Sequence, residues 1–219
     1  MAVLSDADIL RELNDKVIID PFDDKHLGNC SYDVTLGEHY YRSVLKHNRL
    51  YDPYNKSIVD SNWRVHKATF LQETINQYVE VCPEIEDINP PRGAKIILLH
   101  PRETILAHTN EFIGGLNNIT TMMKARSSIG RNFIEICKCA GWGDIGYINR
   151  WTMEITNNSD YYIPLIVGER VAQIVFMYVA TPTNHPYASK YQRNRDLDQI
   201  KKEWQPSDML PKLYKDLAV

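Results

Sequence analysis

Side chains suited to phosphate binding and to proton transfer lie close together in one stretch of this 219-residue chain. The stretch begins with Arg126-Ser127-Ser128 and Arg131, and it ends at Glu154. The planar guanidinium group of arginine binds phosphate oxygens through paired hydrogen bonds, and serine hydroxyls can add donors. A carboxyl group removed from water can give and take protons near neutral pH. We therefore expect the chemistry of the chain in residues 126–154.

The arginine–serine group has two interpretations. If Ser128 caps a short turn over residues 129–134, backbone N–H groups join the side chains around a phosphate. The alternative is a solvated basic turn with a serine cap. The group is not a P-loop, because the pattern GxxxxGK[ST] is absent from the chain.

Glu154 also has two interpretations. Strand alternation puts it on one face with Thr152 and Thr156, opposite Trp151 and Met153. A solvent-facing acid is the simplest explanation of this pattern. A pocket covered by a partner would instead desolvate the carboxyl group and suit it to proton transfer.

A glycine-rich turn over residues 141–147 contains Asp144. The glycines predict unusual φ values or close backbone contacts, and Asp144 is either a turn residue or a ligand to sugar, water or metal. Cys137 and Cys139 alternate and are expected to point to one face. We interpret them as small buried residues, because C-x-C without further ligands is a weak metal site.

Two kinds of catalytic machinery are excluded by their missing motifs. A zinc deaminase of the cytidine type needs His-x-Glu and Pro-Cys-x-x-Cys, and the chain contains neither. A serine hydrolase of the GxSxG type is also unsupported, because that motif is absent.

The elements that must position these residues are mostly strands. Short strands with turn residues between them, and no alternation of strands with helices, predict an antiparallel sandwich or barrel. A short helix is expected over residues 5–14, with Ser5 as N-cap and an apolar stripe of Ile9, Leu10 and Leu13. Two more are expected near 195–203 and 207–217. The expected strands cover 17–19, 31–37 with an extension to 44, 78–82, 95–99, 103–109, 117–125, 133–138, 147–157, 161–167 and 170–179.

Composition and charge are those of an ordinary globular protein. The net charge is −3, with 43% hydrophobic and 24% charged residues. No large basic excess exists, so a polymeric nucleic acid is not an expected ligand. The four cysteines form no CxxC pair, and neither a signal-peptide core nor an apolar run of about 18 residues is present. We expect free thiols, a cytoplasmic location and no contact with a membrane.

The central motif resembles the dCTP deaminase branch of the dUTPase superfamily. Further likeness lies in LSDADI at residues 4–9, SYDVTLG at 31–37, the late strand at 168–176 and residues 189–192. The residues that carry the central likeness are Arg126-Ser127-Ser128, Arg131, Ala140-Gly141-Trp142, Asp144, Gly146-Tyr147 and Glu154.

The resemblance implies an all-β fold: a distorted β-barrel or jelly roll of the dUTPase type, with short flanking helices. It also implies a homotrimer with active sites shared between subunits. We interpret residues 1–219 as a single domain, residues 47–93 as an insertion and residues 182–219 as a C-terminal lid and tail.

The resemblance further implies deamination without zinc. Glu154 would act as general base and acid, Ser127 and the carbonyl of Ala140 would hold the attacking water, and Arg131 would support the reacting site. The implied activity is the hydrolysis of dCTP to dUTP and ammonia in pyrimidine deoxynucleotide biosynthesis.

Other residues would bind the nucleotide. Arg126, Ser128, Tyr187, Lys190 and Gln192 would hold the triphosphate, with Mg²⁺ on its oxygens and no metal bound by the protein itself. The remaining implied contacts are Thr152 and Met153 along the base, Asp144 and Tyr147 at the deoxyribose, where the ring can exclude a 2′-hydroxyl, and Gln173 in the late strand.

The chain departs from the family pattern in places that bear on the product. Ala125 replaces a common glycine, Cys137 a histidine and Ile145 a proline. Gly141-Trp142 and Gln173 resemble members that also cleave dUTP, whereas Glu154 is not expected in a plain dUTPase. The alternatives are therefore a bifunctional dCTP deaminase/dUTP diphosphatase that yields dUMP, a plain dUTPase, or an inactive nucleotide-binding regulator.

Overall fold

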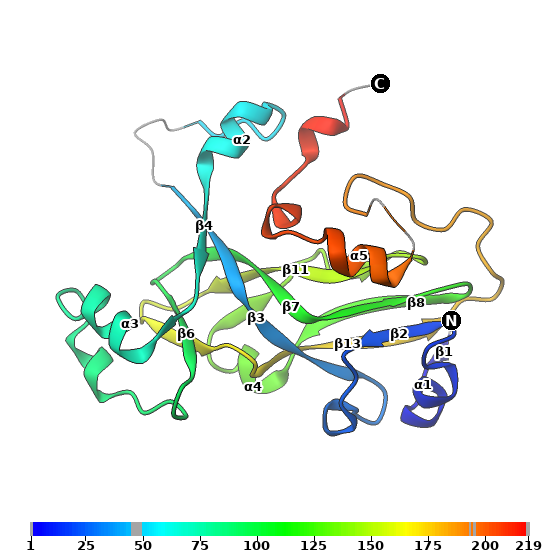
Figure 1. Cartoon of the computed structure of the whole chain (residues 1–219), viewed down its shortest axis with the longest axis horizontal. Helices are drawn as coiled ribbons and strands as arrows, with labels where there is room; N and C mark the ends of the chain where they lie inside the picture. Colours follow the sequence, from blue (N-terminus) through cyan, green and yellow to red (C-terminus); the bar gives the residue numbers. More distant parts are fainter. Residues whose placement is uncertain (1, 45–49, 193, 195, 218–219) are drawn as a thin grey trace.

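Two antiparallel β-sheets form the centre of the molecule, and short helices lie around their margins (Figure 1). The computed structural model describes residues 2–44, 50–192, 194 and 196–217. Within this part, the larger sheet has ten strands and the smaller sheet has three. The expected all-β fold with flanking helices is confirmed.

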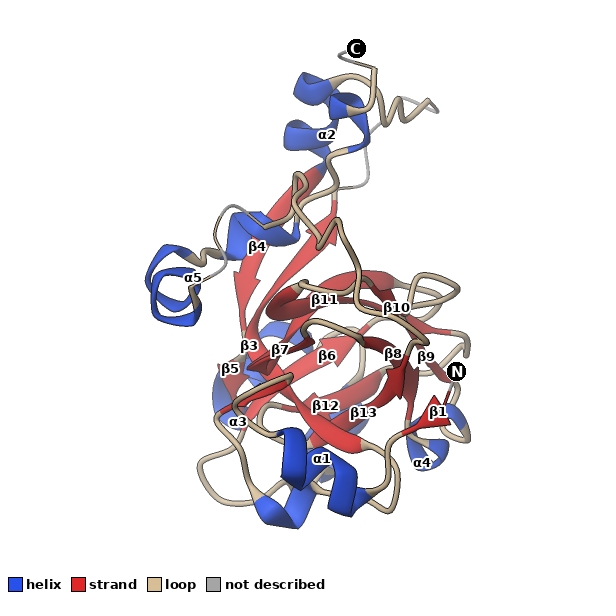
Figure 2. Cartoon of the chain, turned by 90° about the vertical axis from the view of Figure 1, so that its right-hand side faces the viewer, coloured by secondary structure: helices blue, strands red, loops and turns tan. Residues whose placement is uncertain are grey.

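The larger sheet runs in the order β10-β8-β13-β3-β7-β11-β9, with β1 beside β13, β2 beside β7 and β4 beside β3. The smaller sheet runs β12-β6-β5, and Figure 2 shows how the strands curl around a common interior. The strands are β1 (Ala2–Val3), β2 (Val17–Asp20), β3 (Tyr32–Ser43), β4 (Trp63–Lys67), β5 (Thr69–Phe70), β6 (Lys95–Leu99), β7 (Thr104–Gly115), β8 (Ile119–Ala125), β9 (Ile134–Ile136), β10 (Trp142–Gly143), β11 (Ile148–Asn157), β12 (Ile163–Ile166) and β13 (Arg170–Tyr178).

The helices are short, and several are single turns. The α-helices are α1 (Asp6–Glu12), α2 (Lys56–Asn62), α3 (Leu71–Tyr78), α4 (Ser127–Gly130) and α5 (Leu197–Glu203). The 3₁₀ turns are η1 (Asp24–His26), η2 (Pro83–Asp87), η3 (Pro206–Met209) and η4 (Leu213–Lys215). None of the helices in the described part is both long and apolar enough to cross a membrane.

The core lies between the sheets and is filled by the inward face of each strand. Over residues 150–155 of β11, the buried residues are Trp151, Met153 and Ile155, as alternation predicts. They join aliphatic side chains of β3, β7 and β13 in one cluster. The central strands therefore form a rigid support for the outward-facing residues between them.

The start of α1 is confirmed in detail. Ser5 and Asp8 form a reciprocal capping box, which satisfies N–H groups that a helix leaves open at its start. Ile9 is fully buried and Leu13 packs against the core. Leu10, however, is 50% exposed, so the prediction that it belongs to the buried apolar stripe is wrong.

Residues 67–93 differ most from the sequence-based expectation. The strand expected over 78–82 is wrong, because Leu71–Tyr78 forms helix α3. Leu71, Ile75 and Tyr78 have helical spacing, which a strand pattern does not require. Part of the 47–93 segment joins the sheets, since β4 pairs with β3 and β5 with β6, while its residues 47–49 lie outside the described part.

Strand β7 is longer than the expected 103–109 and continues to Gly115. Its last two residues, Gly114 and Gly115, lie within the strand and pack closely against neighbouring backbone. A Cβ on Gly114 would lie 1.9 Å from the carbonyl oxygen of Tyr147 on the neighbouring chain segment. The glycine therefore allows β7 and the start of β11 to approach each other.

At the C-terminal end, α5 matches the helix expected near 195–203. The helix expected over 207–217 is replaced by η3 and η4. Pro211 lies between these turns, and a proline inside a helix removes a hydrogen bond and clashes with the preceding turn. The C-terminal tail, defined here as residues 196–217, runs back across the outer side of β11 (Figure 1).

Candidate active site

A pocket of about 370 Å³ opens between β11, the turn over residues 140–147 and the C-terminal segments. Six of the expected site residues line it together, namely Ala140, Asp144, Tyr147, Thr152, Glu154 and Tyr187. The other lining residues are Leu106, Trp142, Trp151, Tyr191, Met209 and Pro211. The described chain thus gathers an acid, a second carboxylate and several aromatic rings around one space.

Glu154 lies at the floor of this pocket. It pairs with Leu106 of β7, and its side chain points away from the core that Met153 and Ile155 enter. The C-terminal segments cover its face, so the side chain is half-buried and burial raises the pKa of its carboxyl group. The interpretation of Glu154 as a solvent-facing acid is therefore wrong.

A desolvated carboxyl with a raised pKa suits general acid–base chemistry. It holds a proton more readily than an ordinary glutamate, and its ionised form can accept one from a bound water. The backbone at Glu154 is held firmly, because its carbonyl accepts a hydrogen bond of 3.0 Å from the N–H of Cys137.

Cys137 lies directly beneath this site. It is 2% exposed, its thiol contacts the Met123 sulfur at 3.1 Å, and burial raises its pKa to about 12. Cys139 is exposed, so the expectation that the two cysteines share one buried face is wrong. Positive φ angles at Cys137 (60°) and Lys138 (40°) turn the chain and break the alternation.

The glycine-rich turn forms one wall of the pocket. Gly143 lies against Trp151, where an added Cβ would be 2.4 Å from the indole ring. Gly146 has a φ of 93° and donates a 2.7 Å hydrogen bond to the carbonyl of Gly115. The backbone of Asp144 takes part in the turn, since its carbonyl accepts from the N–H of Tyr147 at 3.0 Å, and its exposed side chain lines the pocket.

Tyr147 stands between two other aromatic rings. Its ring meets Trp151 edge to face at 5.7 Å and Tyr187 at 5.2 Å. Burial raises the pKa of Tyr147 well above its ordinary value, so its hydroxyl stays protonated at neutral pH. The ring forms an apolar, uncharged wall beside Asp144.

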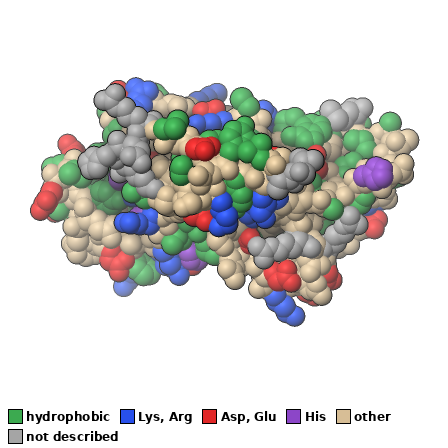
Figure 3. Space-filling model, turned by 90° about the horizontal axis from the view of Figure 1, so that it is seen from above, with side chains coloured by type: hydrophobic (Ala, Val, Ile, Leu, Met, Phe, Trp, Pro, Cys, Tyr) green, Lys and Arg blue, Asp and Glu red, His purple; other side chains and the backbone are tan. Residues whose placement is uncertain are grey.

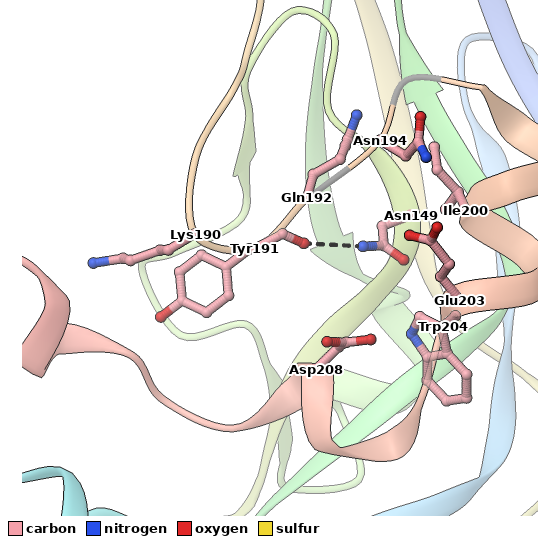
Figure 4. Close-up of a pocket in the computed structure, with 9 residues that line it drawn as sticks. All are labelled: Asn149, Lys190, Tyr191, Gln192, Asn194, Ile200, Glu203, Trp204 and Asp208. Atoms are coloured by element: carbon pink, nitrogen blue, oxygen red, sulfur yellow. Dashed lines mark hydrogen bonds between the residues drawn. The ribbon is translucent and has the colours of Figure 1, made fainter.

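Two of the expected lid residues, Lys190 and Gln192, line a second, neighbouring pocket together with Tyr191 (Figure 4). The ammonium group of Lys190 forms an ion pair with Asp216 of the tail. The amide of Gln192 is 7% exposed and is bonded to backbone groups on both sides of Tyr147. Neither side chain is free for a triphosphate in this arrangement.

The arginine–serine group does not line the pocket with Glu154. Figures 1 and 2 place α4 below the strands, whereas the C-terminal tail lies above them. Ser127, Ser128 and Arg131 are exposed. The guanidinium group of Arg126 lies 3.0 Å from Asp33 and donates to the carbonyl of Arg170.

Several local details of this group differ from expectation. Helix α4 begins two residues earlier than predicted, with Arg126 at the N-cap position and no side-chain cap, so Ser128 is not the cap. Gln173 lies on β13 beside Lys124 of β8 and does not line the pocket. The side chain of Met153 is fully buried in the core, so only its backbone can face a base.

Some lining residues were not predicted from the sequence. Leu106 follows only once the pairing of Glu154 on β11 with β7 is known, and Trp151 lines the pocket although alternation puts it on the opposite face from Glu154. Met209 and Pro211 carry no sequence signal for a site, because the tail brings them there. Among the described residues, no cluster of three His, Cys, Asp or Glu side chains could hold a metal ion.

Viewed from the side of the tail, acidic and basic side chains are interspersed with apolar ones (Figure 3). No broad field of one charge dominates the described part of this face. The pocket is therefore matched to a small ligand with both polar and apolar parts.

Comparisons with known proteins give the family of sequences that this chain resembles. A family model described as dCTP deaminase-like matches residues 3–179. A protein of Methanococcus vannielii named "dCTP deaminase, dUMP-forming" is 30% identical over 93% of this chain and 97% of its own length. A protein of Streptomyces coelicolor with the same name is 28% identical over 86% of each chain.

A solved structure gives independent support for the fold. The 2′-deoxycytidine 5′-triphosphate deaminase from Agrobacterium tumefaciens superimposes with a TM-score of 0.52 at 17% identity. The match covers 81% of this chain and 48% of the Agrobacterium chain. This chain therefore spans about half the length of the Agrobacterium protein.

Proposed function

The chain belongs to the dCTP deaminase-like family of enzymes, and from this premise we propose that it converts dCTP to dUMP. The first step is hydrolytic deamination to dUTP, and the second is cleavage to dUMP and pyrophosphate. The half-buried carboxyl of Glu154, facing a pocket that it shares with Asp144 and Tyr147, is the observation that carries this proposal.

The sequence analysis gave conversion of dCTP to dUTP as the main expectation. The names of the relatives instead favour the bifunctional alternative, which yields dUMP. Several are named for the formation of dUMP at 28–30% identity. Asp144 gives the pocket a second carboxylate, exposed at the edge of the site. One acid for each hydrolytic step is the simplest use of the two groups.

For deamination, ionised Glu154 accepts a proton from the water that attacks C4 of cytosine. The same carboxyl delivers that proton to N3, giving a tetrahedral intermediate. A second proton transfer from the attached hydroxyl, through Glu154 to the amino group, lets the C4–N bond break and ammonia leave. Water and dCTP are thereby converted to dUTP and ammonia, with Glu154 returned to its starting form.

For the second step, Asp144 orients a water towards the α-phosphorus of dUTP and accepts its proton as the water oxygen bonds to that phosphorus. The bond between the α-phosphorus and its bridging oxygen breaks, and pyrophosphate leaves. Mg²⁺ enters as part of the substrate, on the phosphate oxygens, where it offsets negative charge on the departing group. In this proposal no protein side chain binds it directly.

The sugar and base occupy the part of the pocket formed by Tyr147, Thr152 and Trp151. The flat, half-buried ring of Tyr147 beside the sugar leaves little room for a 2′-hydroxyl group. Ala140 lines the same pocket as Glu154, and its backbone carbonyl is the acceptor that we assign to the attacking water.

We further propose that the exposed group on α4 completes the site of a neighbouring copy. Ser127, Ser128 and Arg131 face solvent and offer phosphate donors, while no arginine is among the described residues that line the pocket around Glu154. A cyclic homotrimer would bring the two halves together at each interface. Arg126, held by Asp33, would lie at the same interface.

The test is product analysis from dCTP in the presence of Mg²⁺. Ion-exchange chromatography resolves dCTP, dUTP and dUMP, and a coupled assay measures ammonia. We expect ammonia, dUMP and pyrophosphate in equal amounts. Ammonia with dUTP alone would reject the second step, pyrophosphate from dUTP without ammonia from dCTP would identify a plain dUTPase, and binding without turnover would indicate a regulator.

A further inference from the structure

Four hydrogen bonds join the segment that precedes the tail to the start of β11. We call residues 187–192 the lid segment and residues 145–149 the site turn. The N–H of Tyr187 donates to the carbonyl of Ile145 at 2.7 Å, and the side chain of Asn149 donates to the carbonyl of Tyr191 at 3.2 Å (Figure 4). The other two bonds come from one side chain.

That side chain is Gln192. Its amide oxygen accepts from the N–H of Ile148 at 2.8 Å, and its amide nitrogen donates to the carbonyl of Gly146 at 2.9 Å. These two partners immediately precede and follow Tyr147 in the chain. Gln192 therefore bonds to the backbone on both sides of Tyr147, much as a neighbouring strand would.

The burial of Gln192 strengthens this link. The residue is 7% exposed, and buried hydrogen bonds cost most when one partner is removed. Both polar ends of its amide are used, so the phosphate contact expected from the sequence is not available to it here. The side chain forms hydrogen bonds with the protein backbone and not with a ligand.

The ring of Tyr147 is held from two directions as a result. Trp151 of β11 contacts one part of the ring, and Tyr187 of the lid segment contacts another. Pro186 packs so close to Gly146 that an added Cβ would approach it to 3.0 Å. The ring can withdraw from the pocket only if the lid segment also moves.

We infer that Gln192 is a positioning residue that sets the preference for deoxyribose through Tyr147. This inference rests on the proposed function. With the lid segment docked, a ribonucleotide would have to push Tyr147 outward, and this displacement would break the two bonds of Gln192. A deoxyribonucleotide leaves the ring and both bonds in place, so lid docking and sugar selection are coupled.

The test compares dCTP with CTP in the full-length enzyme. In Gln192→Met, which keeps the side-chain length and removes both hydrogen bonds, the ratio of kcat/KM for dCTP to that for CTP should fall by about tenfold or more. Gln192→Glu keeps the acceptor for Ile148 but places an oxygen against the carbonyl of Gly146, so its ratio should also fall. Gln72→Met, at an exposed position on α3, is the matched control and should leave the ratio unchanged.

Three results would overturn the inference, and they can be told apart. Equal losses for dCTP and CTP, with an unchanged ratio, would mean that Gln192 acts on the triphosphate. A lowered melting temperature with an unchanged ratio would mean a purely structural role. A wild-type protein that does not turn over dCTP would remove the proposed function, and this inference with it.

Discussion

The N–H of Cys137 donates a 3.0 Å hydrogen bond to the backbone carbonyl of Glu154. The bond extends the pairing of β9 with β11 by one residue, past Ile136 and Ile155. Because Cys137 is itself buried against Met123, the backbone beneath the carboxyl is fixed from both sides. The side chain of Glu154 is therefore the movable part of an otherwise rigid floor.

Replacing this acid tests its role in proton transfer. Glu154→Gln keeps the shape of the side chain and removes the group that accepts a proton, so ammonia release should fall by at least about 100-fold. Binding of dCTP, measured by calorimetry, should persist. Glu135→Gln on β9 is a suitable control, since Glu135 does not line the pocket. Ammonia release at the wild-type rate in Glu154→Gln would refute the assignment.

The raised pKa of Glu154 predicts two pH effects. Activity needs the ionised form, so the acidic limb of kcat/KM should lie above the ordinary range of glutamate. Burial disfavours the charge, so the folded state holds its proton more tightly than the unfolded state does. Stability should therefore fall as pH rises from the ordinary glutamate pKa through the raised one.

The same variant isolates this stability effect. Chemical denaturation of wild type and Glu154→Gln should show the variant gaining in relative stability over that pH interval, because the amide carries no charge to bury. A difference that stays constant with pH would show that Glu154 is not desolvated in solution.

Much of the fold could be predicted because strand alternation is local. On β11 the inward residues are those that alternation selects, and Ser5 marks the start of α1 as the capping rule requires. Residues 71–78 were harder, because their apolar spacing is short and mixed with polar residues. Cys137 shows another limit, since a positive φ angle reversed a face that alternation had assigned.

The site could be predicted only in part for a similar reason. Its residue types and spacing were visible around Glu154, but the burial of that acid depends on Met209 and Pro211, far along the chain. The role of Gln192 likewise depends on where the lid segment docks. Contacts between distant segments carry no local signal in a single sequence.

The ion pair between Lys190 and Asp216 predicts that the tail competes with the nucleotide. Lys190 can bind a triphosphate only after leaving Asp216, whose carboxylate raises the pKa of the ammonium group. Asp216→Asn should lower KM for dCTP by about threefold, the scale of a partly exposed ion pair. Asp160→Asn, which breaks an exposed pair with Arg102, should leave KM unchanged. An unaltered KM in Asp216→Asn would exclude this competition.

A substitution at Gly114 tests whether the close approach of β7 to the Tyr147 backbone is needed for stability. Because an added Cβ would lie 1.9 Å from the Tyr147 carbonyl, Gly114→Ala should reduce the free energy of unfolding by about 1–3 kcal/mol. Gly130→Ala is the matched control for stability, since no atom lies within 4 Å of the position of its Cβ. Equal denaturation midpoints for the two variants would mean that the site turn moves away without cost.

A site shared between copies predicts that two inactive variants restore each other. Glu154→Gln removes the acid from the pocket half, and Arg131→Met removes a cation from the exposed half on α4. Each variant alone should be inactive. In mixed trimers, a site that takes Glu154 from one chain and Arg131 from its neighbour is intact, and each mixed trimer has one such site, so about a third of the sites are intact. Co-expression with two different affinity tags, purification on both, and measurement of ammonia release would detect this recovery. If Arg131 instead reached the pocket of its own chain, every site would lack one group, and the mixed oligomers would remain inactive.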